Sequence, residues 1–404
     1  MKKNLYQKTF RGIFLLALLL LFLLITFFSF NSSYFLGSNL VKKQGANALF
    51  KEFLYYLIPP KQEIVAYLPY WVNIDFNKIP LEKISYIQLA FFGIQSDYTL
   101  SYGLNNNNYQ LKNKLSKLTD LQKKNPNLKI IISIGSTELD YTIFANMIMY
   151  PDYRLIFIKD IINFVKIHNI NGVNIDWEYP KSLQDRSNFT IFISELRSAL
   201  NTLYASTKID YYISVSCLVS QGSDKMYDFS GLSKYVNAIE IMSYDLVGKW
   251  STKTGHHSNL YKNHLDKWSI DDGVSLLLAN GVSSNKILIG VPFYGIEFSN
   301  VDSFNNGLYQ DSDTQSEVKY LSYDYIYTYL LNDPAYRSFF TSNNNAQYLF
   351  NEEKKKFITY QGHKSLDVIA TYIKNNRLKG AMIWHIGQDS SKDSLLNSLI
   401  DMLK

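Results

Sequence analysis

Two carboxylates, Asp176 and Glu178, stand two residues apart near the end of an apolar run at positions 172–180. The run is typical of a buried strand, in which successive side chains point to opposite faces, so Asn174, Asp176 and Glu178 share one face. Two buried carboxyl groups side by side separate their pKa values, and one of them stays protonated near neutral pH. This arrangement suits general acid catalysis on a glycosidic bond. An Asp-x-Glu pair alone is more often a solvated strand end, so the hypothesis depends on the longer run.

Eight apolar runs, separated by longer amphipathic stretches, supply the elements that must position this pair. We predict buried parallel strands over Ile64–Trp71, Ile84–Ile94, Leu128–Gly135, Gly172–Glu178, Tyr211–Cys217, Val236–Tyr244, Lys286–Tyr294 and Gly380–His385. We predict helices over Leu111–Lys124, Pro151–His168, Arg186–Tyr204, Asp271–Asn280 and Leu366–Asn376. This alternation indicates an α/β fold, a (β/α)8 TIM barrel over residues 63–404. The alternative is an open doubly wound sheet, which the lack of a glycine-rich phosphate loop after any predicted strand disfavours.

Further polar and aromatic residues lie where the predicted strands end. Tyr244 and Asp245 close the sixth strand, and Trp384 lies near the end of the eighth. Tyr67 and Phe91 belong to the first two strands. Active sites of barrels form at the carboxyl ends of the strands, so we expect these residues to gather around one site.

The connection between the seventh and eighth strands is too long for a simple loop. It contains strand-like segments of its own, such as Tyr348–Phe350 and Lys356–Tyr360. We therefore predict a small α+β insertion over residues 296–360, on the same face as the site.

The run at 172–180 resembles the signature of glycoside hydrolase family 18, Asp-Gly-x-Asp-x-Asp-Trp-Glu-Tyr-Pro. Asp176 and Glu178 match it, whereas Asn171 and Asn174 stand where that family normally has Asp. The segments 133–136, 236–250, 287–295 and 380–384 resemble the third, sixth, seventh and eighth strands of the family. The resemblance covers about residues 64–404.

The resemblance implies retaining, substrate-assisted hydrolysis of β-1,4-linked N-acetylglucosamine polymers such as chitin. Glu178 would be the general acid, and Asp176 would orient the acetamido group whose carbonyl oxygen attacks the anomeric carbon. Tyr244 and Asp245 would hold the acetamido group and the distorted ring. The sugar pocket would be lined by Tyr67, Phe91, Met242, Tyr294 and Trp384. We expect no cofactor and no metal, since His256, His257 and His264 lack a metal-binding spacing.

Asn174 departs from the signature in a way that has a chemical consequence. An amide cannot titrate, but it can donate a hydrogen bond. We therefore expect Asn174 to donate to Asp176, and we expect Asp176, freed from a like charge, to be a permanent anion.

Charge is distributed unevenly along the 404 residues. Residues 1–62 carry eight Lys or Arg and one acid, whereas the remaining 342 residues carry 33 basic and 34 acidic residues. The globular part is therefore nearly neutral and has no electrostatic footprint for nucleic acid.

The N-terminus is typical of a targeting segment. Residues 1–11 form a basic flank, and Gly12–Phe30 is a run of 19 uncharged residues, long enough to span a bilayer as a helix. We predict an uncleaved signal anchor, with the flank in the cytoplasm and the barrel extracellular or lumenal. A cleaved signal peptide and a secreted enzyme are the alternative. Residues 31–62 are expected to be a stalk or linker.

Two other functions remain open at this stage. The barrel could be a sugar-binding module with weak or no activity, which the retained Glu178 disfavours. Alternatively, the hydrolase could act on peptidoglycan or on a glycoprotein glycan.

Overall fold

The computed structural model describes residues 60–103, 108–312 and 318–404. The chain divides at Pro60, and residues 61–404 form one compact unit. The predicted membrane segment at 12–30, its flank and most of the predicted stalk lie outside the described residues. Within the described part of the chain, no helix has the length and apolar character needed to cross a bilayer.

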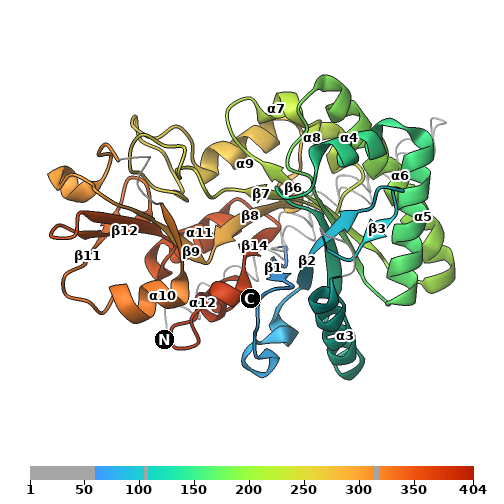
Figure 1. The fold of residues 1–404 in the computed structure, drawn as a ribbon, viewed down its shortest axis with the longest axis horizontal. Coiled ribbons are helices and arrows are strands. Elements are labelled where there is room, and N and C mark those ends of the chain that lie inside the picture. The colour runs from blue at the N-terminus through green and yellow to red at the C-terminus, as the bar shows by residue number, and fades with distance from the viewer. Residues whose placement is uncertain (1–59, 104–107, 313–317) are drawn as a thin grey trace, which may run out of the picture. The chain divides into compact units, whose positions relative to one another are not determined.

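Eight parallel strands close into a barrel (Figure 1). They are β1 (Glu63–Pro69), β2 (Tyr86–Ile94), β4 (Ile130–Gly135), β5 (Gly172–Asp176), β6 (Tyr212–Leu218), β7 (Ala238–Met242), β8 (Ile287–Pro292) and β14 (Gly380–Trp384). Closure is direct, because β1 pairs with both β2 and β14. The predicted (β/α)8 barrel is confirmed, and the open sheet is excluded.

Helices cover the outside of the barrel. They are α3 (Tyr109–Lys124), α4 (Tyr141–Met149), α5 (Pro151–Ile167), α6 (Leu183–Thr207), α7 (Ser223–Met226), α8 (Phe229–Ser233), α9 (Ile270–Ala279), α11 (His363–Asn375) and α12 (Leu395–Leu403). The connection from β1 to β2 is made by two short 3-10 turns, Phe76–Lys78 and Leu81–Lys83. α6 starts at a capping box, in which Ser182 and Asp185 satisfy each other's backbone N–H groups.

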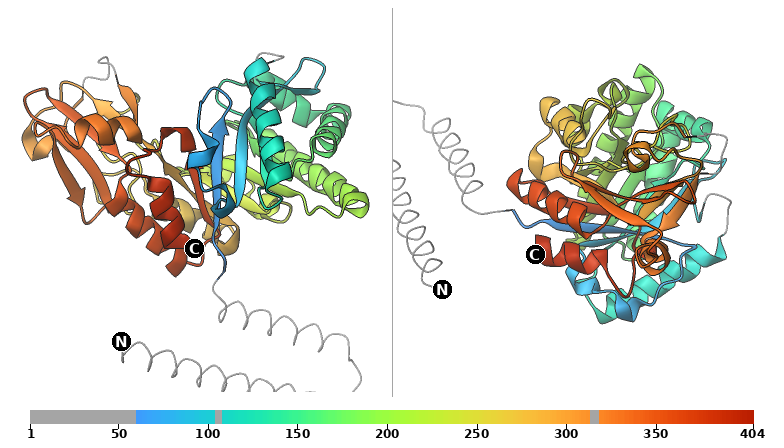
Figure 2. Two further views of the ribbon diagram at one scale, coloured as in Figure 1. Left: turned by 90° about the horizontal axis from the view of Figure 1, so that it is seen from below. Right: turned by 90° about the vertical axis from the view of Figure 1, so that its left-hand side faces the viewer.

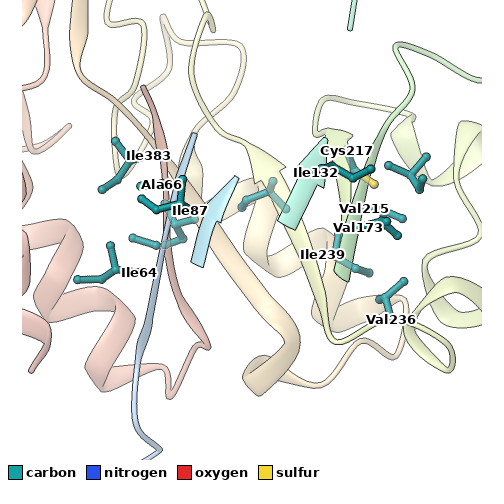
Figure 3. Close-up of a cluster of buried hydrophobic side chains, with 14 of the residues drawn as sticks. Ile64, Ala66, Ile87, Ile132, Val173, Val215, Cys217, Val236, Ile239 and Ile383 are labelled. Atoms are coloured by element: carbon teal, nitrogen blue, oxygen red, sulfur yellow. The ribbon is translucent and has the colours of Figure 1, made fainter. Parts of the chain in front are cut away.

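The barrel strands bury both of their faces. Outward residues such as Val173, Val215 and Ile239 pack with the helices into one large core, part of which Figure 3 shows. Trp177 also belongs to this core and stacks on Phe144 of α4, with ring centroids 4.7 Å apart, so it faces away from the site. Inward residues alternate with these, as the period of a strand requires, and Asn174 lies inside the barrel.

The insertion is a five-stranded antiparallel sheet in the order β10-β9-β13-β12-β11. Its elements are β9 (Tyr294–Phe298), β10 (Lys319–Ser322), α10 (Tyr323–Tyr325) with the π-turn Ile326–Leu330, β11 (Arg337–Thr341), β12 (Ala346–Asn351) and β13 (Lys356–Tyr360). Figure 1 and the left view of Figure 2 show this sheet beside the barrel. A short strand, β3 (Leu100–Ser101), pairs with the end of β2.

The insertion begins two residues earlier than predicted. A single residue, Phe293, separates β8 from β9. Tyr294 therefore belongs to the second sheet and not to the seventh barrel strand, because an unbroken apolar sequence hides the change of sheet.

Candidate active site

The ends of β4 and β5 are fixed to each other through the backbone of Asp176. The N–H of Ser136 donates to the carbonyl oxygen of Asp176 at 2.9 Å. A Cβ at Gly135 would lie 2.0 Å from the same oxygen, so a larger residue does not fit there. Ser136 itself has a φ of 113°, a conformation that residues with a Cβ rarely adopt. These contacts set the height at which the Asp176 side chain enters the barrel.

Asp176 is buried and held by a tyrosine. Its Oδ2 accepts a hydrogen bond of 2.8 Å from the hydroxyl of Tyr67 on β1, whereas its Oδ1 has no protein partner. Burial raises the pKa of Asp176, opposed by hydrogen bonds from Tyr67 and Ser216. That Asp176 is a permanent anion stays a prediction, since burial and these hydrogen bonds shift its pKa in opposite directions.

Asn174 makes hydrogen bonds other than the one predicted. Its amide nitrogen donates to Ser214 at 3.0 Å and to Ser216 at 3.1 Å, and both serines come from β6. Its Oδ1 accepts from Ser133 of β4 at 2.8 Å. The predicted hydrogen bond from Asn174 to Asp176 is wrong, because strand register places serine hydroxyls within reach of the amide.

Glu178 lies just beyond β5 and is only partly exposed. Burial raises the pKa of its carboxyl group, and the negative charges of Asp176 and Asp245 raise it further. Hydrogen bonds from the side chain of Tyr179 and the backbone of Thr137 act in the opposite direction. Burial and these two charges favour the protonated form of Glu178.

Asp245 links the barrel to the insertion. Its Oδ1 accepts a hydrogen bond of 2.5 Å from the hydroxyl of Tyr294, the first residue of β9. The ring of Tyr294 lies 6.3 Å from that of Tyr244 and 5.2 Å from that of His257. His257 is buried, with its Nδ1 4.0 Å from Asp245 Oδ1. The residues predicted at the end of the sixth strand therefore meet Tyr294 in one place.

Three aromatic rings form a second wall of the site. Trp384 of β14 stacks on Phe91 of β2 at 5.6 Å and meets the ring of Tyr67 edge-on at 5.0 Å. Since Tyr67 also bonds Asp176, this wall adjoins the carboxylates. Met242, predicted to line the pocket, is buried at the last position of β7.

Sequence reasoning missed one acidic residue in this region. Glu240 of β7 is fully buried, and its Oε2 accepts a hydrogen bond of 3.3 Å from Gln88 Nε2 on β2. Ser214 and Ser216 of β6 lie near this carboxyl group and lower its pKa, against the larger effect of burial. The alternation of side chains along the sixth strand could have identified Glu240. It shares a face with Met242 and Tyr244, which were both already assigned to the site.

Asn171 and Cys217 lie in structural surroundings. Asn171 Oδ1 accepts from the backbone N–H of Ile130 at 2.8 Å, a structural hydrogen bond at the start of the strand. Cys217 is a free, buried thiol whose pKa burial raises well above its ordinary value. Across the described residues, no group of three or more His, Cys, Asp or Glu side chains could hold a metal ion.

Comparison with known proteins agrees with this geometry. Residues 63–389 match the family model of the glycosyl hydrolases family 18. Chitinase B of Serratia marcescens is 26% identical over 414 aligned residues, which span 85% of this chain and 82% of that protein. Among solved structures, chitinase ChiW of a Paenibacillus species superposes with a TM-score of 0.77 at 29% identity, covering 84% of this chain and 42% of that one. An N-acetylglucosaminidase of Paenibacillus barengoltzii superposes with a TM-score of 0.75 at 25% identity, covering 84% and 99%.

The family match spans most of the chain and includes the strands that carry both carboxylates. The chain belongs to glycoside hydrolase family 18 and is a glycosidase.

Proposed function

We propose that this glycosidase hydrolyses β-1,4 bonds in N-acetylglucosamine polymers of the chitin type, with retention of configuration. The observation that carries the proposal is the environment of Glu178, a carboxyl group at the end of β5 whose pKa is raised by burial and by Asp176. A general acid needs such a raised pKa in order to hold its proton near neutral pH. The similarity to chitinase B and to ChiW supports the choice of polymer.

In the proposed reaction Glu178 gives its proton to the glycosidic oxygen. The acetamido carbonyl oxygen of the sugar attacks the anomeric carbon as the bond to that glycosidic oxygen breaks, and an oxazolinium ion results. The ionised Asp176 accepts the acetamido N–H and stabilises the positive charge. Glu178, now ionised, then takes a proton from the water that opens the ring, which restores the enzyme. Oδ1 of Asp176, which has no protein partner, is the atom available for the substrate.

The remaining residues bind and orient in this proposal. Tyr244 and Asp245 hold the acetamido carbonyl and the distorted ring, and Tyr294 fixes Asp245 through its 2.5 Å hydrogen bond. Trp384 forms the floor beneath the sugar at the cleavage site, backed by Phe91 and Tyr67. Every one of these groups belongs to the protein, so no metal or cofactor takes part in the scheme.

Glu178→Gln tests the assignment, because glutamine keeps the volume and gives no proton. We expect turnover of labelled chitin oligomers to fall by a factor on the order of 10² or more, with sugar binding retained. The matched control is Glu353→Gln, an exposed glutamate in the turn between β12 and β13. A Glu178→Gln enzyme that kept more than a few per cent of wild-type turnover would refute the role of Glu178.

A second candidate is an N-acetylglucosaminidase that acts on peptidoglycan or a glycoprotein glycan. The superposition on the P. barengoltzii N-acetylglucosaminidase, which covers 99% of that chain, favours keeping it. Incubation with chitin oligomers and, in parallel, with a peptidoglycan digest distinguishes the two by which one is cleaved faster. A non-catalytic sugar-binding module would bind either and cleave neither.

A further inference from the structure

A second buried acid, Glu240, lies inside the barrel and is not used by the proposed reaction. It is fully buried on β7, where its neighbours Ile239 and Ile241 point outward into the core shared with the helices. In the strand register Glu240 is the partner of Ser216 on β6. A buried carboxyl group is costly unless it is hydrogen-bonded or neutral, so its presence requires an explanation.

Asn174 lies at the centre of the hydrogen bonds around Asp176. Its amide nitrogen donates to the oxygens of Ser214 and Ser216, and its Oδ1 accepts from the Ser216 hydroxyl at 3.5 Å. The hydroxyl of Ser216 lies 2.9 Å from that of Tyr67, which donates to Asp176. Asn174, Ser214, Ser216, Tyr67 and Asp176 therefore form one hydrogen-bonded network, and Glu240 lies beside it as the register partner of Ser216.

The surroundings of Glu240 accommodate it both with and without a proton. Ionised, it accepts from Gln88 Nε2 at 3.3 Å. Protonated, it can donate to Gln88 Oε1 once that amide turns over, since the two ends of an amide have the same shape. Gln88 Oε1 and Glu240 Oε1 are both buried without a hydrogen-bond partner, so both atoms are available for this second arrangement.

The charges near Glu240 favour its protonated form. Burial raises the pKa of Glu240 to about 8, opposed by its hydrogen bonds from Ser214, Gln88 and Ser216. The titratable groups that interact with it from the surrounding strands are Asp176, Tyr67, Tyr212, Cys217 and Tyr244. None of the five can carry a positive charge, and an ionised Asp176 opposes a negative charge at Glu240.

We propose that Glu240 is a positioning residue that holds the proton which the amide at 174 cannot hold. The family signature normally places an Asp at position 174, beside Asp176, whereas here the titratable partner comes from β7. Glu240 stays protonated while Asp176 ionises, so the buried network carries a single negative charge, located at Asp176. This inference rests on the proposed function, in which Asp176 must be the anion that faces the acetamido group.

Infrared spectroscopy of the full chain tests where the proton resides. Glu178 also has a raised pKa, so the measurement is made in the inactive Glu178→Gln background. Between pH 7 and pH 9, a range that lies above the raised pKa of Asp176, we expect one band of a buried protonated carboxyl group to disappear, and we expect no such band in Glu178→Gln/Glu240→Gln. The control Glu297→Gln, which removes a buried carboxylate paired with Lys356, should leave the band unchanged. A band that persists without Glu240 overturns the proposal.

A double-mutant cycle tests whether the carboxyl group at position 240 takes the place of the one that the family normally has at position 174. Asn174→Asp adds a third buried carboxyl group, and we expect it to lower the melting temperature at pH 8 by about 5 °C. In the Glu240→Gln background the same substitution should cost less than half as much, and the double variant should regain the infrared band. Additive effects overturn the proposal, as would failure of both Glu240→Gln and the double variant to fold. Neither readout depends on hydrolysis, so a wrong substrate assignment would leave them intact.

Discussion

The hydroxyl of Tyr294 donates a hydrogen bond of 2.5 Å to Oδ1 of Asp245, and this bond joins the second sheet to the segment that follows a barrel strand. Asp245 follows the sixth barrel strand, whereas Tyr294 opens the five-stranded sheet. A hydrogen bond to a charged group is stronger than one between neutral groups, so this contact holds the carboxylate in one orientation.

Tyr294→Phe is expected to lower kcat/KM for chitin oligomers by about 10- to 100-fold, because loss of one hydrogen bond to a charged group costs roughly 1.5–3 kcal/mol. Steady-state kinetics measure the effect. Tyr348→Phe, on β12 of the same sheet, is the matched control and should change little. Equal kinetics for the two variants would show that Asp245 needs no help from Tyr294.

The pH dependence of hydrolysis follows from the directions of two pKa shifts. Burial, then the charge of Asp176, raise the pKa of Glu178, so its acid form persists well above the ordinary value of 4.5. Burial also raises the pKa of Asp176 above its ordinary 3.8. We expect a bell-shaped profile of kcat/KM whose two limbs both lie above these ordinary values.

Asp245→Asn sharpens this test. Since the charge of Asp245 raises the pKa of Glu178, its removal should move the basic limb to lower pH. A basic limb near 4.5 in the wild-type enzyme would mean that Glu178 is not the acid.

Ser136→Gly is expected to stabilise the protein by about 1 kcal/mol, because glycine adopts the φ of 113° without the strain of a Cβ. Ser136→Ala is the control, since it keeps the strain and loses the hydrogen bond that Ser136 Oγ accepts from the N–H of Glu138 at 3.0 Å. Denaturant unfolding measures both variants. An order of stability with alanine above glycine would contradict the strain argument.

Substrate assistance makes the acetamido group essential. Fully deacetylated chitosan oligomers lack the attacking carbonyl, so we expect cleavage to fall below detection, whereas a thiazoline mimic of the oxazolinium ion should inhibit. Product analysis on matched oligomers of chitin and chitosan measures this. Comparable rates on the two polymers would require a different nucleophile.

We also predict that Gly12–Phe30 keeps the protein in the membrane. After a carbonate wash the full chain should stay in the membrane fraction, and a variant without residues 1–30 should be released. A mature N-terminus near Asn31 would instead show a cleaved signal peptide.

Most of the barrel could be predicted because parallel strands buried on both faces are continuous apolar runs. The predicted strand ends were wrong where the apolar sequence continues past the end of the strand. Val236 and Tyr244 lie outside β7, and Tyr294 belongs to another sheet, although all three continue apolar runs. The last residues of a strand and the residues that follow it are equally apolar here.

The site residues that could be predicted were those identified by the alternation of side chains along a strand or by their position at a strand end. The hydrogen bonds of Asn174 could not be predicted, because they depend on which side chains of β6 lie at its height. Glu240 could have been found from its parity, but a single acid within an apolar strand gave no motif to draw attention to it.

The direction of β1 has a practical consequence. All eight barrel strands are parallel, and β1 begins at Glu63 beside Gly380, the first residue of β14. The polypeptide therefore enters the barrel at the end opposite the carboxylates. A bead, a fusion partner or an electrode linked ahead of Pro60 would leave the catalytic mouth open to a long polymer, whereas the same linkage on the five-stranded sheet would crowd it. Immobilised forms of the enzyme are best built from that entry point.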